Sequence, residues 1–121
     1  MLIGRERGLS HSVQVVVLLP FFFGIFLALL QWSLDAWGQT TALAAAQEAA
    51  QVAAAVGGSE SDGVASGTAV SGNGSLSNVT VEVVRGSRET VVTVSGNPVT
   101  VLWPSTVTRR ATVPTERLTA P

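Results

Sequence analysis

The sequence predicts an α+β protein, with a long N-terminal helix that crosses a membrane and continues as a stalk, followed by a small antiparallel β-sheet of three or four strands. Three differences in composition predict it. No charge occurs in the 22 residues from Val13 to Leu34, an alanine-rich segment follows, and valine and threonine supply 18 of the 35 residues from Val79 to Val113. The expected parts are a cytoplasmic segment (1–12), a transmembrane helix (13–34), a helical stalk (35–56), a Gly/Ser linker (57–77) and a small β domain (78–121).

The uncharged segment is long enough to cross a bilayer as a single pass of the cell membrane. Its 22 residues would extend over about 33 Å as a helix, and the hydrocarbon core is roughly 30 Å thick. Arg5 and Arg7 precede the segment, and the next arginine is Arg85. Because cytoplasmic flanks are rich in Arg and Lys, the N-terminus is expected in the cytoplasm and the β domain outside. Trp32 and Trp37 stand where the chain leaves the bilayer, the region that indole prefers.

A cleaved signal peptide is the alternative to a permanent span. The two N-terminal arginines resemble a basic n-region, and Ala42, Ala44 and Ala46 resemble a cleavage site downstream. The apolar run exceeds the usual h-region of roughly 7 to 15 residues, and the alanines continue far beyond a cleavage site. Cleavage would release a small secreted β-rich binding module.

Pro20, Gly24 and Ala28 recur every four residues and therefore share one face of the predicted transmembrane helix. Gly24 and Ala28 form a groove of small residues where a second helix can approach closely. Pro20 has no N–H for the Val16 carbonyl, so the helix should loosen or kink there, a defect tolerated where a neighbour covers it. The pattern predicts a helix contact, and the alternative is a face of ordinary small residues exposed to lipid.

The stalk is predicted from alanine, the residue with the highest helix propensity. Nine alanines lie within residues 42–55, and Gly57 and Gly58 then favour a C-terminal stop. One helix is therefore expected over residues 12–56. A stripe at spacings of three and four suits packing, and its members are Leu43, Ala46, Ala50 and Ala53.

Beyond the stalk the pattern changes from linker to strand. Residues 57–77 have no sustained periodicity, which predicts a linker with at most a short strand or turn near residues 64–70. Residues 79–83 and 89–94 are rich in β-branched side chains on either side of a turn at residues 85–88. This arrangement predicts a β-hairpin.

Two further strands are expected at residues 99–103 and 107–113, after a turn at residues 95–98. Arg109 and Arg110 are adjacent in the last strand, so their side chains leave on opposite faces and at least one must be exposed or paired. A domain of this size has a thin core. We therefore expect the sheet to pack against the stalk helix or a partner.

The composition argues against catalysis and cofactor binding. The chain has no cysteine, lysine or tyrosine, and its one histidine, His11, is separated from the outer serines by the predicted membrane. Glu82 and Glu89 are the nearest approach to paired carboxylates, but Arg85 and Arg88 lie between them and favour ordinary cross-strand pairs. The sequence predicts no enzyme, no cofactor, no metal and no small-molecule substrate. The net charge of −1 also argues against nucleic acid as a partner.

The N-terminal order of residues resembles a known family. Arg7 and Gly8 are followed by a short polar stretch, the uncharged polar Gln14, an apolar run and Pro20. This order is similar to the N-terminus of TadE-like proteins, the minor pilins or pseudopilins of the tight-adherence (Flp) pilus system, and the segment Ala111–Glu116 is similar to the end of their strand region. The resemblance implies a non-enzymatic membrane subunit that assembles with pilin-like subunits or pilus assembly proteins, in a pilus or a related secretion machine.

The resemblance also implies cleavage by prepilin peptidase between Gly8 and Leu9. In the family the polar position is usually a glutamate, one residue closer to the glycine, and its carboxylate meets the new N-terminal amine in a medium of low dielectric constant. Gln14 offers only neutral hydrogen bonds, so an uncleaved, permanent membrane component is the alternative. Gln14 joins Pro20, Gly24 and Ala28 as the predicted helix-packing residues.

Overall fold

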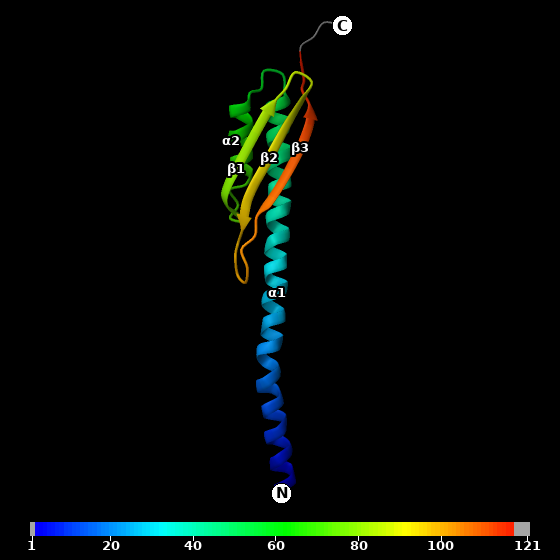
Figure 1. The fold of residues 1–121 in the computed structure, drawn as a ribbon, viewed down its shortest axis with the longest axis vertical. Helices are drawn as coiled ribbons and strands as arrows, with labels where there is room; N and C mark the ends of the chain where they lie inside the picture. Colours follow the sequence, from blue (N-terminus) through cyan, green and yellow to red (C-terminus); the bar gives the residue numbers. More distant parts are fainter. Residues whose placement is uncertain (1, 118–121) are drawn as a thin grey trace.

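The computed structural model describes the backbone of residues 2–117 and the side chains of residues 12–117. In Figure 1 a single long helix runs the length of the molecule, and all other elements gather around its C-terminal half. The predicted α+β class, with a three-stranded antiparallel sheet, is confirmed. In chain order the elements are α1 (Leu2–Ala54), α2 (Glu60–Val70), β1 (Leu76–Arg85), β2 (Glu89–Pro98) and β3 (Val107–Pro114).

Helix α1 is continuous from the apolar segment into the alanine-rich segment and passes through Pro20. It ends at Ala54, close to the expected end, because Gly57 adopts the left-handed conformation (φ 78°) and the Gly58 N–H bonds the Ala55 carbonyl at 2.8 Å. Within the described residues, one helix is long and apolar enough to cross a membrane, and it includes residues Ser12–Ala54.

The sheet has the order β1-β2-β3, and both pairs are antiparallel. The predicted hairpin around residues 85–88 is confirmed, but two expectations further along are wrong. Residues 95–98 are not a turn, because they continue β2 and pair with both neighbouring strands. Residues 99–103 are not a strand, because backbone groups at three of them bond a side chain of α1 instead.

Strand β1 contains an irregularity that the alternating pattern did not predict. Its register with β2 shifts between Ser77 and Thr80, where Asn78 has a positive φ of 51°. Side chains alternate between the faces of a strand, so Leu76 and Val83 would face opposite sides in a regular strand. The bulge brings both into the core.

Helix α2 corrects the prediction of a linker over residues 57–77. Ser59 caps it, and its Oγ accepts a hydrogen bond from the Asp62 N–H at 3.2 Å. Glu60 and Asp62 place negative charge in the first turn, where it favours the helix dipole. Gly63 and Gly67 are buried against α1, and a Cβ on Gly63 would lie only 2.9 Å from the Ala53 Cβ. These glycines therefore allow two helices to approach closely.

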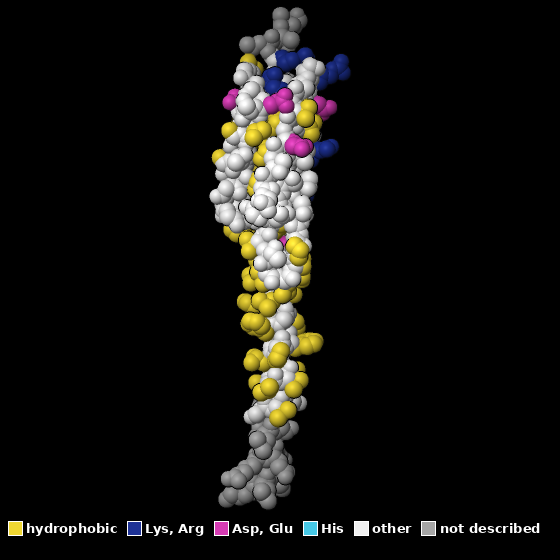
Figure 2. All heavy atoms as spheres, turned by 60° about the vertical axis from the view of Figure 1, so that its left-hand side comes forward, with side chains coloured by type: hydrophobic (Ala, Val, Ile, Leu, Met, Phe, Trp, Pro, Cys, Tyr) yellow, Lys and Arg dark blue, Asp and Glu magenta, His cyan; other side chains and the backbone are white. Residues whose placement is uncertain are grey.

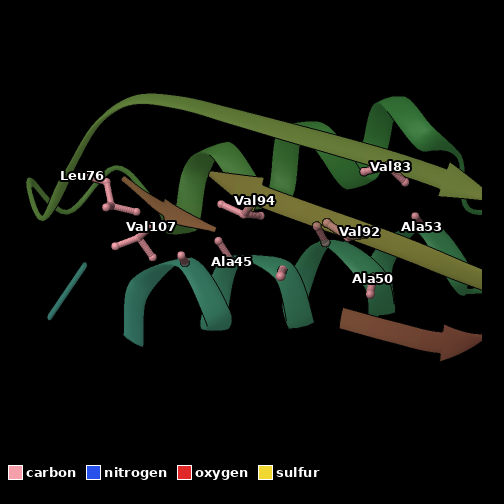
Figure 3. Close-up of a cluster of buried hydrophobic side chains, with 11 residues drawn as sticks. Ala45, Ala50, Ala53, Leu76, Val83, Val92, Val94 and Val107 are labelled. Atoms are coloured by element: carbon pink, nitrogen blue, oxygen red, sulfur yellow. The ribbon is translucent and has the colours of Figure 1, made fainter. Parts of the chain in front are cut away.

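The core lies between the sheet and one face of α1, as Figure 3 shows. Leu43, placed on the packing stripe by the sequence, is instead 37% exposed. The other three members of that stripe are buried under the protein's own sheet. The residues expected to form a separate stalk therefore form one side of the domain core. The core consists of Ala42, Ala45, Ala46, Ala49, Ala50, Ala53, Leu76, Val83, Val92, Val94 and Val107.

Candidate functional site

The N-terminal half of α1 carries an uncovered apolar surface. From Val13 to Leu30 every large apolar side chain except Leu27 is exposed. We call residues 12–30 the free helix. Figure 2 shows its hydrophobic side chains standing out around the rod below the domain. A surface of this size and length is suited to lipid or to other apolar helices rather than to water.

One side of the free helix is hollowed where the sequence places its small residues. A shallow apolar groove, the Gly24 groove, is lined by Pro20, Phe21, Gly24, Ile25 and Ala28. Apart from Gly24 itself, its two chain neighbours and the adjacent helix backbone, no atom lies within 4 Å of the position that a Cβ on Gly24 would occupy. The backbone is therefore open to close approach from outside the chain.

The remaining predicted site residues lie further toward the N-terminus. Gln14 is exposed on the free helix. Gly8 and Leu9 belong to the backbone of α1 but lie outside the residues whose side chains the structure describes. The roles of Gln14 in helix packing and of Gly8 and Leu9 in cleavage stay predictions.

The paired carboxylates considered from the sequence are held apart. Glu82 pairs with Thr93 across the β1–β2 hairpin, and Glu89 lies four residues from Thr93 along β2. At about 3.4 Å per residue the two glutamates are roughly 14 Å apart along the strands. This separation is too large for one carboxyl group to share a proton with the other.

Gln31 is a site that sequence reasoning missed. It lies just above the free helix, and its side chain is completely buried. Its Oε1 accepts hydrogen bonds from the N–H groups of Val101 at 2.6 Å and Leu102 at 2.9 Å. Its Nε2 donates to the Val99 carbonyl at 3.1 Å and to Asp35 Oδ1 at 2.9 Å. One amide side chain therefore fixes the loop between β2 and β3 to α1.

Arg85 is the second site that the sequence did not reveal. Its Nε donates to the Ala53 carbonyl at 2.8 Å, and the Glu116 N–H donates to the Ala54 carbonyl at 2.7 Å. These groups satisfy carbonyls in the last turn of α1, which have no partner within the helix. A cation at this end also favours the helix dipole. The end of β1 and the segment after β3 thereby hold the end of α1 inside the domain.

The comparison with protein families concerns the helix that carries these features. Residues 10–51 match the family model for TadE-like proteins. The TadE-like segment includes the whole free helix, Gln31 and most of the buried alanines, and it ends before α2 and the sheet. The match confirms the resemblance found in the N-terminal residues, and with the apolar helix it indicates a membrane-anchored protein associated with a pilus system. No match was found among curated proteins or among solved structures.

Proposed function

We propose that this chain is a non-enzymatic minor pilin-like subunit, anchored in the membrane by a single pass and taking part in assembly of a tight-adherence pilus or a related secretion machine. The observation that carries the proposal is the TadE-like segment, which coincides with a free helix whose Gly24 groove is open. Such a groove has apolar walls and suits a helix of another pilin-like subunit.

The architecture supports an anchored subunit over a secreted binding module. Ala42 and Ala46, which resemble a signal-peptidase site, are fully buried beneath the sheet. Cleavage near Ala45 would remove Ala42, Gln31 and the first part of the helix from the core of the folded domain. Mass measurement of the native protein tests this point. A start at Met1 indicates a plain anchor, a start at Leu9 indicates prepilin processing, and a start near Ala45 would contradict the proposal.

The proposed orientation has the N-terminus inside, because Arg5 and Arg7 lie on that side and the other arginines lie beyond the free helix. Protease added to spheroplasts should therefore remove the domain and spare the N-terminal residues. Protection of Arg109 and Arg110, which are exposed in the structure, would refute this orientation.

Close contact through the Gly24 groove is tested by Gly24→Ile. The larger side chain fills open space in the single chain, so it should not disturb the fold. It should weaken association with a partner helix by about 1–2 kcal/mol while keeping the segment apolar enough to insert. Crosslinking or co-purification yield is the measurement.

Phe22→Ile is the matched control, because Phe22 is exposed on a different side of the same helix. Its crosslinking yield should equal that of the wild type. If Gly24→Ile also leaves the yield unchanged, the groove faces lipid and the proposed contact is wrong.

A further inference from the structure

The loop between β2 and β3 presents an uncovered apolar surface at the end of the domain nearest the free helix. Within this loop, Leu102 and Trp103 are each 45% exposed, and Val99 and Val101 are only slightly less so. We call residues 99–103 the apolar loop. Figure 1 shows the β2–β3 connection extending beyond the sheet along α1, toward the N-terminal half of the helix.

The apolar loop lies at the level where α1 meets the edge of the bilayer. Its Val101 and Leu102 N–H groups bond Gln31. Gln31 lies 18 residues after Val13, about 27 Å along a helix, and a hydrocarbon core is roughly 30 Å thick. The loop is therefore held at the depth of the membrane interface if α1 spans the membrane from Val13.

The tryptophans of the chain mark the same level. The chain has three. Trp32 is adjacent to Gln31 and 70% exposed, Trp37 lies less than two turns further along α1, and Trp103 follows the loop residue that bonds Gln31. Indole rings with an apolar body and one N–H donor concentrate at membrane interfaces. Two of the three come from α1 and the third comes from the loop, so distant parts of the chain place tryptophan near the same interface.

Three backbone polar groups of the apolar loop have hydrogen-bond partners within the protein, which suits a medium with little water. Irregular backbone at membrane depth is costly unless its N–H and C=O groups are satisfied within the protein. Gln31 satisfies the Val99 carbonyl and the Val101 and Leu102 N–H groups. The loop can therefore expose its side chains without exposing these polar groups.

Charge is absent from this end of the sheet. No charged residue occurs between Glu89 and Arg109. Asp35 is the nearby acid, and its carboxylate already accepts hydrogen bonds from Gln31 Nε2 and from Ser105 Oγ at 3.1 Å. Figure 2 shows most of the visible Arg, Asp and Glu side chains at the opposite end of the domain. This distribution matches a lipid surface at the loop and water at the far end.

We propose that the apolar loop inserts into the interface of the leaflet from which the domain emerges, as a second membrane contact beside α1. This inference rests on the proposed anchoring of α1. The loop then contacts lipid through Val101, Leu102 and Trp103, and it holds the base of the sheet against the membrane.

The test uses the full chain reconstituted in phosphatidylcholine vesicles, with tryptophan fluorescence as the probe. One variant keeps Trp103 alone (Trp32→Phe with Trp37→Phe), and a second keeps Trp32 alone. Lipids brominated near the headgroup or near the end of the acyl chain quench a tryptophan according to its depth. Trp103 should show blue-shifted emission in vesicles and stronger quenching by the bromine near the headgroup. Trp32 should be quenched as well, which reports that α1 is inserted.

A charge in the loop gives the matched comparison. Adding Leu102→Glu should weaken quenching of Trp103 and leave quenching of Trp32 in its own single-tryptophan variant unchanged. Val84→Glu is the control, because Val84 is exposed on β1, away from the loop, and it should alter neither signal.

The outcomes separate the two proposals. Quenching of Trp32 without quenching of Trp103 overturns the loop contact alone, and quenching of neither overturns the anchoring of α1 together with it. A third outcome is blue-shifted Trp103 emission without quenching, with a blue shift that disappears when added lipid dilutes the protein in the membrane. This outcome would show that a second copy of the protein covers the apolar loop, and it would also overturn the proposal.

Discussion

Replacement of Gln31 by leucine should release the apolar loop from α1 while the rest of the domain stays folded. Leucine has a similar volume and a helix propensity at least as high, so α1 itself should persist. The change removes the acceptor for two backbone N–H groups and the donor for the Val99 carbonyl. Burial of these groups without partners would cost about 1–3 kcal/mol each. Because the loop is at the surface, it should open rather than remain packed with these groups unpaired.

The expected magnitude follows from those bonds. If the two N–H bonds to Oε1 contribute about 1 kcal/mol each, the closed loop loses about 2 kcal/mol of free energy relative to the open loop. Every 1.4 kcal/mol is a factor of about ten, so amide exchange at Val101 and Leu102 should accelerate by more than tenfold. The measurement is residue-resolved hydrogen exchange of the full chain in a detergent micelle. Amides in the centre of β2, such as Val92, should exchange as in the wild type.

Gln51→Leu is the matched control, because Gln51 is an exposed glutamine on the same helix. It should leave exchange in the loop unchanged. If Val101 and Leu102 keep their protection in Gln31→Leu, then Gln31 does not hold the loop, and the depth assigned to the loop from this contact is wrong.

Three further changes test the packing of the domain. Gly63→Ala should lower the free energy of unfolding by about 1–2 kcal/mol, although alanine has the higher helix propensity, because the new Cβ would lie 2.9 Å from the Ala53 Cβ. An unchanged or higher midpoint of thermal unfolding in detergent would contradict this prediction. Arg85→Met should cost about 1 kcal/mol through loss of the hydrogen bond to the Ala53 carbonyl, and faster amide exchange confined to the last turn of α1 and the segment after β3 is the expected result. Ala50→Glu should prevent folding of the sheet onto α1, because it places an unpaired carboxylate in the core. Leu43→Glu, at an exposed position, is the control and should give a wild-type circular dichroism spectrum. A folded Ala50→Glu variant would refute the assignment of the alanine face to the core.

The parts of the fold that the sequence predicts are those set by local pattern. The apolar run and the alanines both favour helix and follow one another without a break, so α1 is predictable from Ser12 almost to its end. Its start was not predicted, because the helix begins at Leu2, ten residues before Ser12. The hairpin is predictable because β-branched residues alternate on both sides of a turn at residues 85–88. Burial of Ala46 and Ala50 follows from their spacing, but the pattern does not reveal whether the covering surface is a partner or the chain's own sheet.

The parts that could not be predicted depend on contacts between distant residues. Helix α2 has the composition of a linker, and its glycines become favourable only where Gly63 and Gly67 pack against α1. The β-branched residues at 99–103 have the propensity of a strand, but Gln31, about 70 positions away in the chain, binds their backbone. The sequence holds only a weak local signal for this site. Gln31 is an amide at the end of the apolar run, and the acid Asp35 follows it one helical turn later.

The Gly24 groove and the alanine face of α1 share one side of the helix, which gives the groove an upper limit. Gly24 and Ala42 are 18 residues apart, about five complete turns, so they point in nearly the same direction. Gln31 lies between them on that side, and the β2–β3 loop covers it. A partner helix that enters the groove at Pro20 therefore has only about 16 Å of α1 before it meets the loop. Beyond Gln31 a partner helix cannot stay against this side of α1, because the β2–β3 loop and then the sheet occupy it.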